Sequence, residues 1–264
     1  MKNLTKMGLL FLAGFSFAAQ SGTIFVTKTS ADSGDDVSRT FYQDDMLRID
    51  SNGQQDNSSM IYDVQANVFY MIDHDEKSYT RIDKASMKKL VVILKNSKQR
   101  MKEQLASMPK EQQAMMSGMM GGMYSKDKPK SIYKLVKTSK SDKVLGIDCQ
   151  QVDSFKNGKK HSELCIASLD DLPNGNEMFK AFAGMTKMLS DFMKEMPMAD
   201  EDSINANATF KQLNGFPIID KETKNGRVTS ISKLFSVKEV KLDASKFEVP
   251  QGYRKEDFEK QFSF

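Results

Sequence analysis

The chain has few of the residues on which common catalytic and metal sites are built. Among its 264 residues there is no tryptophan, and there are 2 cysteines and 2 histidines, His74 and His161. Neither histidine has a second histidine or a cysteine at ligand spacing, which argues against a zinc site of the usual kind. A single histidine would suffice for a Ser-His-Asp triad, but the sequence contains no Gly-x-Ser-x-Gly motif and no glycine-rich phosphate loop. We therefore expect a protein that is not an enzyme and that holds no cofactor.

The chain also has no excess of one charge that would mark a nucleic-acid binder. Its 39 Lys and Arg and 35 Asp and Glu give a formal net charge of +4, and the two signs are interspersed. Loss of Lys2 and Lys6 with a cleaved leader would bring the charge closer to zero. Nucleic-acid binding needs a concentrated basic patch, so we expect no nucleic-acid partner.

The N-terminus has the pattern of an export signal. Lys2 and Lys6 precede an apolar stretch from Met7 to Ala18, which is too short for a bilayer span of ~20 residues. Ser16-Phe17-Ala18 fits the small-x-small rule for cleavage, with Ala19 as a second exit residue. This order predicts a signal peptide over residues 1–19, with a buried N-terminal helix as the alternative.

No cysteine lies near the cleavage region, and no later stretch is long and apolar enough to span a membrane. We therefore expect release without a lipid anchor and no stable membrane insertion after cleavage. In a Gram-negative cell this predicts a periplasmic location.

Short apolar runs separated by polar turns predict antiparallel strands over much of the mature chain. Turn residues stand at Asp44, at Asn52-Gly53 and at Asn67. The expected strands are residues 23–27, 40–42, 46–49, 59–62, 68–72, 78–82, 132–136, 147–155, 161–168, 216–219, 228–235 and 237–242.

Two segments instead have the spacing of helices. Asp83 is a suitable N-cap for the first, in which apolar residues recur at helical spacing from Met87 to Met108. Pro109 could then open a short helix that ends at Gly121-Gly122. The second helix runs from about Asn176 to Met196, and its apolar stripe is Met178, Phe182, Met185, Leu189, Phe192 and Met196.

The order of elements is strands, helix, strands, helix, strands, without βαβ alternation. This order predicts an α+β fold with a mostly antiparallel sheet and the helices packed on one face. We expect a single domain over residues 20–264.

The two cysteines, Cys149 and Cys165, lie on the arms of one expected hairpin. A three-residue loop, Lys156-Asn157-Gly158, would pair Phe155 with Lys159 and would place the cysteines directly opposite each other, at a distance that a disulfide can bridge. A two-residue Asn157-Gly158 loop would miss this register by one residue. We predict a disulfide, as suits an exported protein, over a redox-active pair, which would usually have Cys-x-x-Cys spacing.

Methionine is abundant, at 19 of 264 residues, and most of it gathers in two helical segments. The first group is Met101, Met108, Met115, Met116, Met119, Met120 and Met123, and the second is Met178, Met185, Met188, Met193, Met196 and Met198. These methionines could be ordinary helix core, or an adaptable apolar surface that repacks around ligands. They could also bind Cu(I) through their thioethers. The methionines close enough together in the sequence to form such a Cu(I) site are Met115, Met116, Met119, Met120 and Met123.

Several short motifs resemble a family of exported bacterial proteins that carry a domain of unknown function, number 4412. They are Arg39–Ser51, Ser59–Asp63, Phe69–Asp73, Lys77–Tyr79, Gly146–Cys149 and Phe247–Tyr253. The family is distantly similar to the outer-membrane lipoprotein carriers. That resemblance implies a curved antiparallel half-barrel, closed by helices over an apolar cavity for acyl chains, and it implies no catalytic residue.

These observations predict a periplasmic, non-enzymatic binding protein with an apolar, methionine-lined cradle. Its ligand would be lipid-like or an acylated protein. The expected lining residues are Met87, Leu94, Met101, Met115, Met119, Phe182, Met185 and Leu189. A periplasmic copper-handling protein that uses segment 115–123 and a structural or interaction protein of the cell envelope are the alternatives.

Overall fold

The computed structural model describes residues 21–53, 57–110, 112, 131–195 and 212–262. The predicted signal peptide, residues 1–19, lies outside these ranges. So does most of the segment between Pro109 and Gly122, in which a second short helix was predicted.

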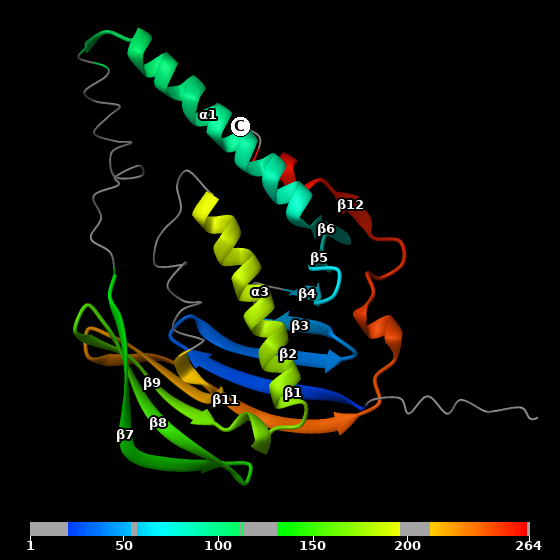
Figure 1. Cartoon of the computed structure of the whole chain (residues 1–264), viewed down its shortest axis with the longest axis vertical. Coiled ribbons are helices and arrows are strands. Elements are labelled where there is room, and N and C mark those ends of the chain that lie inside the picture. The colour runs from blue at the N-terminus through cyan, green and yellow to red at the C-terminus, as the bar shows by residue number, and fades with distance from the viewer. Residues whose placement is uncertain (1–20, 54–56, 111, 113–130, 196–211, 263–264) are drawn as a thin grey trace, which may run out of the picture.

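The described chain forms one curved, open sheet of 12 strands, with the order β12-β6-β5-β4-β3-β2-β1-β11-β10-β9-β8-β7 (Figure 1). Neighbouring strands are antiparallel, except for the short parallel pair of β12 and β6. The two halves of the sheet are joined in the middle by β1 and β11, which lie far apart in the sequence. The strands are β1 (Gly22–Ala31), β2 (Gly34–Gln43), β3 (Met46–Asn52), β4 (Asn57–Asp63), β5 (Val68–Asp73), β6 (Ser78–Ile82), β7 (Tyr133–Val144), β8 (Ile147–Lys156), β9 (Lys159–Ala167), β10 (Phe216–Lys224), β11 (Arg227–Val240) and β12 (Arg254–Glu256).

Two long helices, α1 (Lys84–Ser107) and α3 (Gly175–Glu195), lie on one side of this sheet (Figure 1). Three short 3₁₀ turns complete the described elements: η1 (Leu169–Asp171), η2 (Ala244–Phe247) and η3 (Phe258–Phe262). The α+β class, the half-barrel-like sheet and the placement of both helices are therefore as predicted.

The turns that join the strands use the residues expected of them. Asp44 and Asn67 have φ angles of 50° and 52°, in the left-handed region that short polar side chains tolerate. Asn157 and Gly158 are both left-handed, with φ angles of 53° and 76°. That combination defines the two-residue type of hairpin turn.

The predicted Cys149–Cys165 disulfide is present, but the predicted register of its hairpin is wrong. The loop has two residues, with Lys156 opposite Lys159, and a bulge follows at Phe155. Cys149 consequently faces Ala167, and the two cysteines are diagonal neighbours on one face of the sheet. Their Cα atoms are still only 5.3 Å apart, which is within bridging distance.

Two strands differ from those predicted from the apolar pattern of the sequence. β11 is one strand where two were predicted, and β7 extends to Val144 through a polar stretch that has no apolar alternation. Lys137, Lys140 and Lys143 on β7 are exposed because this strand is the edge of the sheet. Charged edge strands are common because they discourage pairing with other chains, and they leave little hydrophobic signal.

The main core lies between the sheet and α3. Met178, Ala181, Met185 and Met188 form the buried side of the helix at three- and four-residue spacing. Beneath them the rings of Tyr62 and Phe69 stack at 4.7 Å. α3 is thus fixed on the sheet along most of its length.

Candidate functional site

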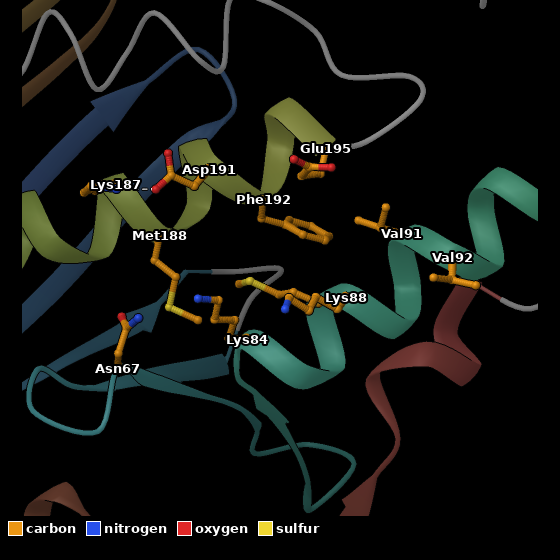
Figure 2. Close-up of a pocket in the computed structure, with 11 residues that line it drawn as sticks. Asn67, Lys84, Lys88, Val91, Val92, Lys187, Met188, Asp191, Phe192 and Glu195 are labelled. Atoms are coloured by element: carbon orange, nitrogen blue, oxygen red, sulfur yellow. Dashed lines mark hydrogen bonds and ion pairs between the residues drawn. The ribbon is translucent and has the colours of Figure 1, made fainter.

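An apolar groove, here called the interhelical groove, opens between the start of α1 and the end of α3 (Figure 2). Its volume is about 650 Å³, which is within the ~300–1,000 Å³ of small-molecule sites. Val91 of α1 and Phe192 of α3 point toward each other across it. Its lining residues are Asn67, Lys84, Met87, Lys88, Val91, Val92, Lys187, Met188, Asp191, Phe192 and Glu195.

The start of α1 is held by a capping box. The Asp83 carboxylate accepts hydrogen bonds of 2.9 Å from the backbone N–H groups of Ala85 and Ser86, and the Ser86 hydroxyl contacts the Asp83 N–H in return. Arg81 forms an ion pair with the same carboxylate. The hydrogen bond from the Ser86 N–H, together with Arg81, lowers the pKa of Asp83 below its usual range.

The buried side chains of α1 are distributed differently from those of α3. The buried side chains of α1 are Met87, Leu90 and Val91, all near its start. From there the helix rises away from the sheet (Figure 1). Within the described residues, the α3 wall is therefore buried along the helix, and the α1 wall is buried mainly near its start.

A third element, η3, joins the two walls. The rings of Phe258 and Phe192 are 6.2 Å apart, and Phe258 is buried in the main core. Glu259 lies 3.7 Å from Lys89 of α1. The C-terminal segment therefore supports both helices at the groove.

The charges around the groove are unevenly paired. Lys187 and Lys194 both contact Asp191 and hold its pKa below the usual range. Glu195 lies 3.6 Å from Lys95 of α1, a contact between the two walls. Among the described residues, no acidic partner lies within ion-pair distance of Lys84 or Lys88.

The structure distributes the predicted lining residues over several environments. Met87 lines the groove, while Leu94 and Phe182 are half-buried against the main core. Met185 is buried between α3 and the sheet, Leu189 is exposed, and Met101 is half-buried farther along α1. Met115 and Met119 lie outside the described residues.

The sequence pattern does not mark the other groove residues as ligand-binding. Val91, Met188 and Phe192 were assigned to helical segments but were not distinguished from core positions. Lys84 and Lys88 were missed altogether, although they lie one turn apart and flank Met87. The sequence feature that points to them is the pair of lysines at i and i+4 beside an apolar stripe.

No group of three or more His, Cys, Asp or Glu residues in the described ranges could hold a metal ion. The methionines proposed for Cu(I), residues 115, 116, 119, 120 and 123, lie outside those ranges. Within the same ranges, no helix is both long and apolar enough to cross a membrane.

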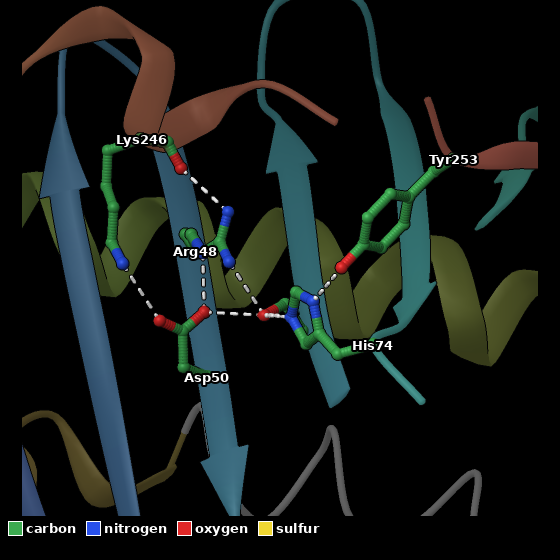
Figure 3. Close-up of polar contacts among 6 residues, drawn as sticks. Arg48, Asp50, His74, Lys246 and Tyr253 are labelled. Atoms are coloured by element: carbon green, nitrogen blue, oxygen red, sulfur yellow. Dashed lines mark hydrogen bonds and ion pairs between the residues drawn. The ribbon is translucent and has the colours of Figure 1, made fainter. Parts of the chain in front are cut away.

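A second polar assembly, here called the outer polar cluster, lies on the sheet face opposite α3 (Figure 3). Arg48 donates to Asp50, to Ser59 and to the backbone carbonyl of Lys246. The Lys246 ammonium lies 3.0 Å from Asp50. Burial acts to raise the pKa of Asp50, but hydrogen bonds from Ser59, Arg48 and Lys246 outweigh it, so that the pKa is lowered.

His74 completes the outer polar cluster. Its Nε2 is 2.7 Å from the Ser59 hydroxyl, and its Nδ1 is 2.9 Å from the hydroxyl of Tyr253. In a nucleophilic triad the second imidazole nitrogen would meet a carboxylate, and the serine would be open to substrate. Here Ser59 is 3% exposed and donates to Asp50. The cluster is therefore suited to fastening the C-terminal segment to the sheet.

A third polar feature is the half-buried Asp220 of β10. One of its carboxylate oxygens is buried without a hydrogen-bond partner. Burial, with a smaller contribution from Glu222, raises its pKa to about 6, while His161 opposes the shift. Asp220 is consequently a pH-sensitive position in the body of the sheet.

Comparison with known families identifies one match. The model of the family described as Domain of unknown function (DUF4412) matches residues 84–253, which include α1, α3 and both cysteines. No curated protein matches the chain in sequence.

Several solved structures align with the chain at low identity. An uncharacterized conserved protein from Thermus thermophilus has 7% identity and a TM-score of 0.43, with 89% of this chain and 90% of that chain covered. PNGF-II has 11% identity and a TM-score of 0.39, and the alignment covers 91% of this chain but 32% of PNGF-II. A DUF1329 family protein from Desulfovibrio piger ATCC 29098 has 9% identity and a TM-score of 0.18, with 88% and 91% covered. Because each of these TM-scores is below 0.5, none of the likenesses supports a conclusion about function.

Proposed function

The chain belongs to the family described as Domain of unknown function (DUF4412), and we propose that it is a non-enzymatic binding protein for a lipid-like ligand. The observation that carries this proposal is the interhelical groove, which is of ligand size and combines apolar side chains from two helices with charged residues at its walls. A free lipid or the acyl chain of an acylated protein would bury its apolar part there, driven by removal of that surface from water.

The unequal burial of the two walls supports this proposal. α3 is packed on the sheet, whereas α1 is buried only near its start. We expect the less buried α1 wall to shift relative to α3, so that the groove widens for a ligand and refills without it. Methionine at the wall, as at Met87 and Met188, suits such repacking because its side chain is unbranched.

The predicted export signal supports a periplasmic place of action. The leader pattern of residues 1–19 predicts secretion, and the Cys149–Cys165 disulfide is the kind of bond that persists in oxidising compartments. The outer polar cluster supports the non-enzymatic part of the proposal, because its serine is enclosed and its histidine lacks a carboxylate partner.

The test uses the absence of tryptophan from the chain. The variant Val92→Trp introduces a single fluorophore at the rim of the groove, where Val92 is 56% exposed. We expect its emission to shift to shorter wavelength when hexadecanol is added below its aggregation limit, because the ligand removes water from around the ring. Native mass spectrometry of protein purified from the periplasm should show a bound lipid.

Val228→Trp is the matched control. Val228 is 46% exposed on β11 and does not line the groove, so its emission should not respond. Equal responses at both positions would show non-specific adsorption. No response at Val92→Trp together with no co-purifying lipid would refute the proposal.

A further inference from the structure

We infer that the interhelical groove selects an anionic amphiphile of the fatty-acid kind, with the carboxylate held between Lys84 and Lys88. This inference rests on the proposed function, and it adds the chemistry of the head group. The apolar tail would lie along Val91, Met188 and Phe192.

The first support is the distribution of charge. The acidic residues that line the groove are already engaged, because Asp191 contacts Lys187 and Lys194, and Glu195 contacts Lys95. Lys84 and Lys88 have no such partner among the described residues, and both are exposed. The side chains of Lys84 and Met188 lie close together at one end of the groove, with Lys88 beside them (Figure 2). This end of the groove therefore carries uncompensated positive charge directly beside apolar surface.

The second support is that these lysines do not stabilise their own helix. Lys84 occupies the first turn of α1, where the helix dipole disfavours a cation, and this turn contains no acidic residue. Lys84 and Lys88 are also a like-charged pair at i, i+4, which is unfavourable in a helix. A bound anion between them would relieve both effects.

The third support distinguishes a carboxylate from a phosphate. Phosphate sites typically use free backbone N–H groups at a helix start or the planar fork of arginine. At α1 the N–H groups of Ala85 and Ser86 are already taken by Asp83, and none of the described residues that line the groove is an arginine. Two flexible lysines suit a small singly charged head group.

The test compares hexadecanoate with hexadecanol, two probes of equal chain length, in the Val92→Trp protein. Changing both Lys84→Gln and Lys88→Gln should weaken hexadecanoate binding by about 3- to 30-fold, the range expected for losing two exposed ion pairs. Hexadecanol binding should not change. The matched control, Arg100→Gln with Lys102→Gln, removes the same charge from exposed positions of α1 outside the groove and should alter neither affinity.

Each other outcome has a distinct meaning. Unchanged hexadecanoate binding in the Lys84/Lys88 variant, or equal loss for both probes, would overturn the head-group assignment while the proposed function stands. Tighter binding of hexadecyl phosphate that depends on the same lysines would replace the carboxylate with a phosphate. If the Val92→Trp protein with Lys84 and Lys88 unchanged bound neither probe, the proposed function itself would be refuted.

Discussion

At the scale of single residues, Asp220 is the position at which burial in the fold disfavours the charged form of the side chain. Its carboxylate has one buried oxygen without a partner, and its pKa is raised from 3.8 to about 6. Because the folded state holds the proton more tightly than the unfolded state, the protein is relatively more stable below pH 4. That advantage is lost as the pH rises through 6.

We predict that Asp220→Asn removes this pH dependence. At pH 7 the free energy of unfolding should rise by about 1–2 kcal/mol after allowance for solvent screening, because the neutral amide carries no buried charge. At pH 4 the variant and the original protein should be nearly equal. Urea titrations at the two pH values provide the measurement, with Asp35→Asn, an exposed aspartate of β2, as the control. Equal gains at both pH values would contradict this explanation.

At the scale of elements, the interhelical groove depends on how α1 begins. Asp83 satisfies two N–H groups of the first turn and pairs with Arg81. The same turn carries Lys84, and the next carries Lys88. The cap therefore sets the direction of the helix and, with it, the position of both lysines.

We predict that Asp83→Ala lowers the free energy of unfolding by about 1 kcal/mol, the usual cost of losing an N-cap. Asp83→Asn, which keeps a capping oxygen, should recover most of this loss. Thermal unfolding by circular dichroism gives the comparison, and hydrogen exchange of residues 84–92 should accelerate only in the alanine variant. If alanine and asparagine behaved alike, the capping box would not be what holds the start of α1.

At the scale of the whole molecule, long-range connections hold an open sheet together. β1 pairs with β11, and the outer polar cluster joins Asp50 to Lys246, whereas the disulfide links the neighbouring hairpin strands β8 and β9. An unclosed sheet has two free edges, and no barrel closure stabilises it. Contacts between segments that are distant in the sequence therefore help to hold this open sheet together.

We predict that the double variant Cys149→Ala and Cys165→Ala is less stable by about 3 kcal/mol, since the bond closes a loop with a sequence separation of 16. For a chain of this size the midpoint of thermal unfolding should fall by about 6–12 °C. Calorimetry with and without reductant measures the effect, and the reductant should destabilise only the unsubstituted protein. Two free thiols in native, exported protein would contradict the assignment.

Features that depend on neighbouring residues could be predicted from the sequence. The left-handed residues Asn67 and Gly158, the cap at Asp83 and the apolar periods of the strands and helices are local properties, because each needs only a few consecutive residues. The length of the Asn157-Gly158 loop was predicted wrongly. The disulfide was also predictable, since two cysteines in an expected hairpin have no other partner. Its register was not predictable, because the bulge at Phe155 leaves no mark in the apolar pattern.

Contacts between distant side chains, in contrast, follow from the tertiary structure. Val91 and Phe192 face each other because both helices lie on one side of a sheet whose strand order is not written in any local pattern. His74 meets Tyr253, 179 residues away, only because the C-terminal segment returns along β6. The interhelical groove and the charge of Lys84 and Lys88, which has no acidic partner among the described residues, arise in the same way, since burial and ion pairing depend on what the rest of the chain brings alongside.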